Sequence, residues 1–300
     1  MTIPIIFIHY GNSNCLFQSI WQAKQSNPDS PIILLGDQAN IHYHWLLGID
    51  HYLIKAYTDN SRYSLKHYVH LSTNGELFER FCIERWFILY RFLQQRPDIP
   101  RCVYLDSDVL IYDLLDPPAD ELAHFGMTMV GYSAHTNFVS NKNVLGEFCL
   151  FIQQHYNEPS KKSWLHDHYS KFIEKHGCGG ISDMTFFHKF RAYHSDEIGI
   201  ISDVFGKDLM YTFDERIDTD FGGYEMQNGF KNIFWLNGKP YCKNNLNRKI
   251  VKFNTLHFQG ASKIKMIDFV QNRNILFWVN LIINQTVLLQ NKIFRKFKLG

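Results

Sequence analysis

Two acidic residues, Asp106 and Asp108, lie one residue apart in an otherwise apolar stretch of the chain, RCVYLDSDVLIY (residues 101–112). The apolar residues on both sides predict a strand in the middle of a sheet, where an unpaired ionised carboxylate is costly. If the strand stays extended, both side chains point the same way, because alternate residues of a strand share a face. Their oxygens could then converge on one cation. The alternative is that both are loop or helix-capping acids.

The segments before this pair alternate between strand and helix patterns. The sequence predicts strands over residues 3–9, 31–35 and 51–54, a helix over residues 15–25 and a long helix over residues 76–95. This order is typical of an α/β protein with a mostly parallel sheet. In open sheets of this kind, ligands bind at the carboxyl ends of the strands, where the acidic pair is expected.

Composition narrows the function classes. The 300 residues are 45% hydrophobic, and 31 Lys and Arg against 29 Asp and Glu give a net charge of +2, so no global field favours nucleic acid. The six cysteines form no CxxC pair, which predicts a reduced state. The first residues, MTIPIIFIHYGN, lack the basic segment and cleavage site of a signal peptide, so we expect a cytoplasmic location.

A second motif lies near the end of the chain, in LHFQGASK (residues 256–263). Its H-x-x-G-x-x-K spacing, together with YLDSD (residues 104–108), resembles the glycogenin-like (family 8) nucleotide-sugar transferases of the GT-A glycosyltransferase fold. The resemblance covers roughly residues 3 to 265. It implies a Rossmann-like, mixed and mostly parallel sheet flanked by helices.

The resemblance also implies a set of site residues. Asp106, Asp108 and His257 would bind Mn²⁺ or Mg²⁺, which accept oxygen ligands and, for Mn²⁺, an imidazole. The nucleotide-sugar donor, expected to be a UDP-sugar, would contact residues of both motifs, the ends of the first two strands and two arginines ahead of the acidic pair: Tyr10, Gly11, Asn12, Asp37, Arg80, Arg85, Ser107, Gly260 and Lys263. Other interpretations remain open: a core histidine for His257, a surface lysine for Lys263 and surface ion pairs for the arginines.

A third candidate is Asp183, in the segment HGCGGISDMTF (residues 176–186). The glycines permit positive φ, and the following apolar run predicts a helix that begins beside this acid. Asp183 is therefore either a helix cap or, as the resemblance implies, a catalytic acid that contacts the donor sugar or the acceptor. The two roles are compatible.

These features predict a metal-dependent glycosyltransferase that moves a sugar to a hydroxyl of a glycan or glycolipid, in bacterial surface polysaccharide or lipopolysaccharide synthesis. Residues 1–265 would form the catalytic domain, with a nucleotide-binding half (1–112) and an acceptor-binding half (113–265). One alternative is a haloacid-dehalogenase-like phosphatase, whose DxD motif carries a nucleophilic aspartate but normally opens the domain. The other is a GT-A scaffold that binds glycan without turnover.

The last segment, residues 266–300, is expected to be helical and basic. Residues 275–289 are apolar, but polar residues interrupt them, and a spanning helix needs about 20 mostly apolar residues. Residues 292–298 interleave Lys and Arg with Ile and Phe, and no acid follows Asp268. This pattern fits either peripheral contact with an anionic membrane or a helix packed on the domain with a solvated basic end.

Overall fold

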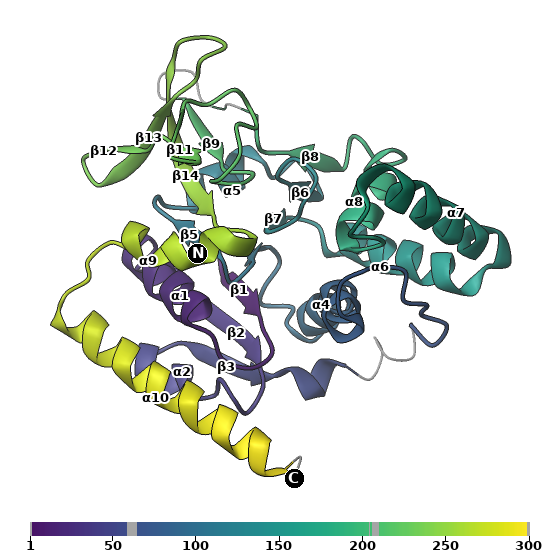
Figure 1. Ribbon diagram of the computed structural model, residues 1–300, viewed down its shortest axis with the longest axis horizontal. Helices are drawn as coiled ribbons and strands as arrows, with labels where there is room; N and C mark the ends of the chain where they lie inside the picture. Colours follow the sequence, from purple (N-terminus) through teal and green to yellow (C-terminus); the bar gives the residue numbers. More distant parts are fainter. Residues whose placement is uncertain (1, 59–64, 204, 206–209, 299–300) are drawn as a thin grey trace.

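The structure is a computed structural model that describes residues 2–58, 65–203, 205 and 210–298, with the backbone alone beyond residue 292. Five strands form its main sheet in the order β3-β2-β1-β4-β7 (Figure 1). The strands are β1 (Ile5–Ile8), β2 (Ile32–Gly36), β3 (Asp50–Leu53), β4 (Cys102–Leu105) and β7 (Thr136–Val139). The first four run parallel, and β7 pairs antiparallel with β4.

Both faces of this sheet are buried. Ile5 and Phe7 of β1 belong to one hydrophobic core, whereas Ile6 and Ile8 belong to a second core on the opposite face. This division follows from the alternation of side chains along a strand. A parallel sheet with two apolar faces needs helices on both of them.

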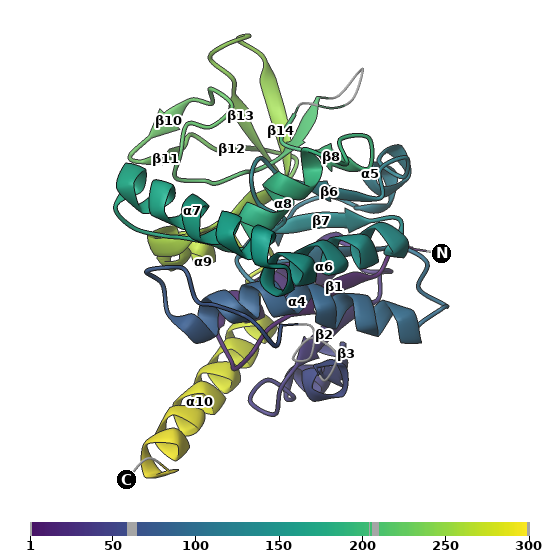
Figure 2. The same cartoon turned by 90° about the vertical axis from the view of Figure 1, so that its right-hand side faces the viewer.

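Helices supply this cover (Figures 1 and 2). Three helices pack on the first face: α1 (Asn14–Ser26), α2 (Tyr43–Leu47) and α10 (Ile275–Lys298). The second core is built from α4 (Glu76–Gln95), α6 (Lys142–Asn157), α7 (Pro159–His176) and α8 (Asp183–Arg191). The predicted class, α/β with a mixed and mostly parallel sheet flanked by helices, is confirmed.

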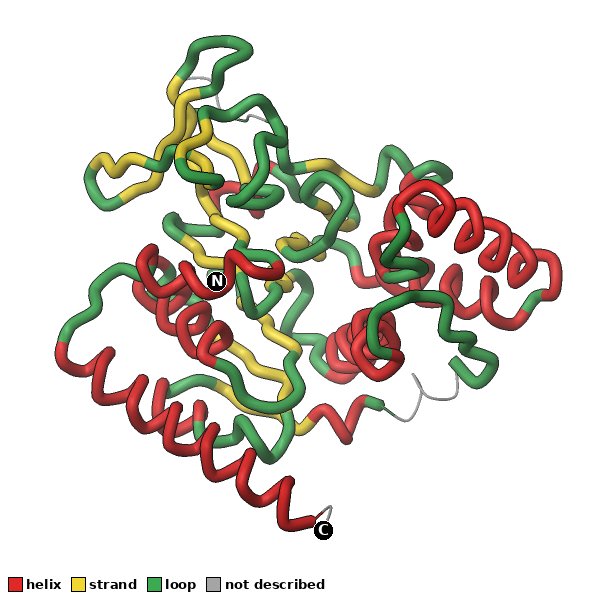
Figure 3. Tube along the Cα trace, viewed as in Figure 1, coloured by secondary structure: helices red, strands yellow, loops and turns green. Residues whose placement is uncertain are grey.

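A second sheet lies beyond the carboxyl end of β4. Its order is β12-β13-β14-β5, with β9 parallel to β14, and Figure 3 shows these strands gathered at one end of the molecule. The strands are β5 (Val109–Ile111), β9 (Tyr211–Phe213), β12 (Phe234–Leu236), β13 (Lys239–Lys243) and β14 (Ile250–His257). A hairpin turn at Asn237-Gly238 joins β12 to β13, and both residues have the positive φ that this turn requires.

Short elements complete the described chain. Two strand pairs are β6 (Met127–Met129) with β8 (Ile198–Ile200), and β10 (Met226–Gln227) with β11 (Phe230–Lys231). The short helices are η1 (Ile54–Tyr57), α5 (Asp116–Glu121), η2 (Gly260–Lys265) and α9 (Met266–Phe269).

Residues 101–112 form two strands, β4 and β5, where the sequence predicts one. The chain turns at the acidic pair, and the Val109 amide donates to the Asp106 carbonyl at 3.3 Å. After this turn β5 leaves the main sheet and pairs antiparallel with β14, with Val109 opposite His257. The two carboxylates therefore do not share one face of an extended strand, and the turn sends them in different directions.

Helix α10 is held by one fully buried aromatic ring. Phe277 has no exposed surface, and its ring centroid lies 5.5 Å from that of Phe17 and 5.2 Å from that of Trp21, both on α1. We expect Phe277→Ala to lower the free energy of unfolding by about 3 kcal/mol, because it leaves a cavity between the two helices. The exposed neighbour Ile275 is the control, and Ile275→Ala should cost less than about 0.5 kcal/mol. Equal effects in urea unfolding would contradict this packing.

Candidate active site

The first acid of the pair, Asp106, lies beside a buried arginine at the end of β4. Arg85 of α4 places Nη1 2.6 Å from Asp106 Oδ1, and the Tyr104 hydroxyl donates to the same oxygen at 2.5 Å. Burial raises the pKa of Asp106, and the guanidinium opposes this rise. Both contacts engage Oδ1, so Oδ2 is the oxygen that a ligand would meet.

Asp183 binds the other side of the same guanidinium. Arg85 Nη2 lies 2.5 Å from Asp183 Oδ2, and the Trp86 indole donates to that oxygen at 3.0 Å. Burial lowers the pKa of Arg85, but the two carboxylates raise it more, and the net shift is upward. Asp183 is the first residue of α8 rather than its cap, which is Ser182 in a capping box with Thr185.

The segment that leads into α8 is fixed against residues 71–73. The Ile181 amide donates to the Leu71 carbonyl at 2.7 Å. At Gly180 an added Cβ would lie 2.3 Å from that carbonyl oxygen and 2.4 Å from the Ser72 Cα, so only a hydrogen fits there. The glycine thus sets how closely the start of α8 approaches its neighbour.

The second acid, Asp108, forms a separate cluster with residues of the carboxyl-terminal motif. His257 donates from Nδ1 to the Glu215 carbonyl at 2.8 Å, which in the neutral ring leaves a lone pair on Nε2. That nitrogen lies 3.7 Å from Asp108 Oδ1, while Lys263 Nζ lies 2.9 Å from Asp108 Oδ2. Burial lowers the pKa of Lys263, but the Asp108 carboxylate raises it above its ordinary value.

A buried ion pair holds His257 in place. Lys231 Nζ lies 2.8 Å from Asp214 Oδ1, with at most 1% of either side chain exposed, and Asp214 Oδ2 accepts from the His257 amide at 3.0 Å. The His135 ring stacks on the His257 ring with centroids 3.8 Å apart and donates to the Asp214 carbonyl. Sequence reasoning missed these three supporting residues. The position of Asp214, directly after the apolar run YTF, was a usable signal, whereas nothing local marks Lys231 or His135.

The cluster around Asp108 matches the ligand chemistry of a divalent cation. A carboxylate oxygen and an imidazole lone pair face each other across 3.7 Å with no proton between them in the neutral ring, a separation that two metal bonds of about 2.1 Å can bridge. The three predicted ligands are not all within 4.8 Å of one another in the described chain, because Asp106 turns toward Arg85. Asp108 and His257 are therefore the primary pair.

Three of the predicted donor contacts lie at the ends of β1 and β2. The Gly11 amide donates to Asp37 Oδ2 at 3.0 Å, and Asn40 ties the two loops together by donating to the Gly11 carbonyl at 2.7 Å. The Tyr10 ring lies 4.6 Å from the Phe81 ring of α4 and is 44% exposed. This edge of the sheet thus presents an aromatic face next to a carboxylate that is fixed by backbone amides.

Two of the predicted donor contacts have other partners. Asn12 accepts from the Tyr43 hydroxyl at 2.6 Å and donates to the Asn284 carbonyl of α10. Arg80 forms an ion pair at 2.8 Å with Glu84, one turn along α4, as in the surface-pair alternative. Both residues lie next to the site, but their side chains are engaged in bonds that stabilise the fold and do not contact the Asp108 cluster.

The two remaining predicted residues lie in turns. Ser107 is the middle residue of the turn between the two acids. Gly260 opens η2 with φ +62°, and no atom lies within 4 Å of the position that a Cβ would take. The space in front of Gly260 is therefore open to a ligand, and Lys263 follows on the same short helix.

His9, directly after β1, lies close to both Asp37 and the Asp108 cluster. Burial lowers the pKa of His9 to about 4, Asp37 and Asp108 oppose this shift, and Lys263 adds to it. These influences show that groups from β1, β2, the acidic turn and η2 share one neighbourhood.

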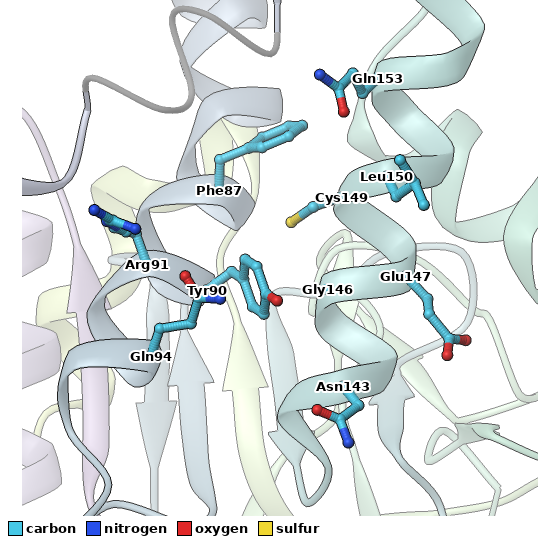
Figure 4. A pocket seen from close by; sticks show the side chains of 10 residues that line it. All are labelled: Phe87, Tyr90, Arg91, Gln94, Asn143, Gly146, Glu147, Cys149, Leu150 and Gln153. Atoms are coloured by element: carbon cyan, nitrogen blue, oxygen red, sulfur yellow. The ribbon is translucent and has the colours of Figure 1, made fainter.

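A separate hollow lies between α4 and α6 (Figure 4). It encloses about 480 Å³, and its lining includes Tyr90 and Arg91 on one helix and Glu147 and Gln153 on the other. No predicted site residue lines it. Near its rim, Glu147, His194 and Glu197 bring their ligand atoms within 4.8 Å, but the last two form an ordinary surface pair three residues apart.

No protein-family model matches the chain, and no curated protein matches it. Similar solved structures include mouse xyloside xylosyltransferase 1 (9% identity, 67% of this chain and 86% of that chain, TM-score 0.46). The bifunctional glycosyltransferase WbbM (10%, 90% and 50%, 0.47) and the galactosyltransferase LgtC in complex with donor and acceptor sugar analogues (9%, 93% and 100%, 0.45) are also similar. All three TM-scores lie below 0.5, so any functional conclusion has to come from the site residues.

Arg85 and Arg80 offer a matched pair of substitutions on one helix. We expect Arg85→Met to lower the free energy of unfolding by roughly 3–5 kcal/mol, because it leaves Asp106 and Asp183 buried without their shared cation. Arg80→Met removes an exposed i,i+4 pair and should cost less than about 1 kcal/mol. Urea unfolding of both variants measures the difference, and similar losses would show that the Arg85 pairs contribute little.

The lowered pKa of His9 predicts a pH dependence of stability. Between about pH 6.5 and pH 4 the unfolded chain binds a proton that the folded protein excludes, so stability falls as the pH falls through this window. Above the window the contribution is complete. His9→Gln should flatten the pH profile of the unfolding free energy in this window relative to the native protein. Parallel profiles would mean that His9 titrates normally in the folded state.

Proposed function

We propose that this protein is a metal-dependent glycosyltransferase that moves a sugar from a nucleotide-sugar donor, a UDP-sugar, to a hydroxyl of a glycan or glycolipid. The observation that carries the proposal is the cluster of Asp108, His257 and Lys263. It unites the two motifs, which are far apart in sequence, at the carboxyl end of β4. Two side chains that can bind a cation lie there. They are next to a lysine and an open glycine turn, and these two features suit a diphosphate.

The charges at this edge favour a bound cation. Three carboxylates, those of Asp106, Asp108 and Asp183, lie near two cations, Arg85 and Lys263, so the acids exceed the basic groups by one. Asp108 and His257 would hold Mn²⁺ or Mg²⁺ directly, and Asp106, which is turned toward Arg85, would add its negative charge nearby. When bound, the ion would supply Lewis-acid stabilisation of the leaving nucleoside diphosphate.

The remaining residues bind and orient the donor. Lys263 supplies a point charge next to Asp108, and the open space at Gly260 lets phosphate oxygens approach the backbone. At the other end, Asp37 and the exposed face of Tyr10 suit the ribose and the base. This division of roles matches a diphosphate bound between the acidic turn and η2.

Asp183 acts, in this proposal, as a positioning residue. Sequence reasoning gave it contact with the donor sugar or the acceptor. It is only 3% exposed, however, and its carboxylate is bonded to Arg85 and Trp86, so it fixes Arg85 and through it Asp106. This positioning role does not require a free oxygen of Asp183 to contact the acceptor hydroxyl.

The contacts of Asp106 disfavour the phosphatase alternative. In that class the first acid of the motif attacks phosphorus, which requires an oxygen with high electron density. Here Arg85 and Tyr104 both donate to Oδ1 of Asp106, and because the charge of a carboxylate is shared by its two oxygens, these contacts make Oδ2 a weaker nucleophile as well. Release of nucleotide from a UDP-sugar, without release of phosphate from phosphomonoesters, would separate the two classes, and glycan binding without either would identify the non-catalytic scaffold.

We expect Asp108→Asn to lower Mn²⁺-dependent nucleotide release by at least about a hundredfold, since even residues that only support metal ligands cost 10–100-fold when they are removed. EDTA should abolish the native activity, and Mn²⁺ should restore it. His257→Ala should weaken UDP binding in Mn²⁺ by calorimetry. The control is Asp120→Asn, which removes an exposed acid paired with Arg101.

Circular dichroism and urea unfolding should show the Asp108→Asn and Asp120→Asn variants folded. Full turnover by metal-free protein in chelator would refute the metal assignment. Unchanged UDP affinity in the His257→Ala variant would make that histidine structural.

A further inference from the structure

Helix α10 exposes an apolar stripe on the side that faces away from the domain. Its inner side is buried through Phe277 and Leu281, which pack on α1. Its outer stripe is made of residues at helical spacing, each 44–84% exposed: Ile275, Trp278, Val279, Ile282 and Leu289. Exposed apolar residues at i, i+3, i+4, i+7 and i+14 lie on one side of the helix, which is unusual on a solvated helix.

The neighbouring helix α2 carries another exposed apolar residue. The backbone of α2 is bonded to α10, because Asn280 Nδ2 donates to the Leu46 carbonyl at 3.4 Å. The adjoining residue Trp45 is 64% exposed. Tryptophan is favoured at the boundary between water and lipid, since its ring is apolar and its indole N–H is polar.

Charge at this part of the chain has one sign. After Asp268 the sequence has no acid and five Lys or Arg residues, four of them within residues 292–298. Within the described residues, no helix combines the length and apolar character needed to cross a bilayer. A helix with an apolar face and basic residues, but without a spanning segment, matches an element that lies in the plane of an anionic membrane surface.

We propose that the outer stripe of α10, with Trp45, docks the protein on an anionic lipid surface. A second copy of this chain fits less well, because its α10 would bring another all-basic segment and no acid to pair with it. Gln285 also interrupts the stripe between Ile282 and Leu289, where a helix–helix seam needs an apolar residue. Docking would hold the enzyme at a surface where glycolipid acceptors lie, but it does not depend on the proposed function, because vesicle binding needs no turnover.

The test is co-sedimentation of the full chain with vesicles of phosphatidylcholine, alone or mixed with phosphatidylglycerol. We expect binding to the mixed vesicles at low salt, several-fold weaker binding to the neutral ones, and release by added salt. The double variant Ile282→Asn, Leu289→Asn should lower the partition coefficient about tenfold or more, because it removes two inserted side chains.

The control is Leu77→Asn, Leu246→Asn, which removes two leucines elsewhere that are even more exposed (86% and 81%, against 61% for Ile282 and 60% for Leu289) and should bind like the native chain. Donor hydrolysis in solution, measured separately, should be the same for all three proteins. The proposal fails if the native chain stays in the supernatant at low salt or if the stripe variant sediments like the native chain. If the native chain and the control variant dimerise but the stripe variant does not, the stripe binds a second copy of the chain. That result would overturn the membrane assignment.

Discussion

The candidate site depends on one buried guanidinium. Arg85 lies between Asp106, at the end of β4, and Asp183, at the start of α8, so three elements share one set of charges. Removing these charges from water costs several kcal/mol per ion, and only close pairing offsets it. The positions of α4, α8 and the strand end are therefore coupled: none can move without separating an ion pair inside the protein.

The second half of the site is positioned from the other sheet. His257 belongs to β14, and its ring and amide are held by Glu215 and Asp214, which in turn pairs with Lys231. The turn at residues 106–108 is the point where the two sheets meet, because β4 ends there and β5 begins beside β14. The position of Asp106 is thus set by the main sheet, and the position of Asp108 is set by the second sheet.

Local signals were sufficient for the elements that precede the acidic pair. The predicted helix over residues 76–95 has the observed bounds, and the four other predicted early elements begin and end within two residues of the observed ones. The Asn237-Gly238 turn also has a local cause, since few residue pairs accept two positive φ angles. The sequence did not reveal the break in the strand at residues 106–108. Both flanking segments are apolar, and the break is caused by a partner strand far along the chain. Partners that are distant in sequence also explain why Arg80 and Arg85 were predicted together as donor contacts. Only the folded structure shows that Arg80 pairs with Glu84 and Arg85 with Asp106 and Asp183.

The crowding at Gly180 has a consequence for how this site can vary. The residue contributes no charge and touches no proposed ligand, yet a methyl group there would collide with the backbone of residues 71–72. Any larger side chain would push the start of α8 outward and carry Asp183 away from Arg85. A chain that diverges from this one could change many surface positions without effect, whereas exchanging this one small residue would dismantle the charge arrangement by steric means alone. A substitution at position 180 would therefore break the ion pairs of Arg85 without replacing any ionisable residue.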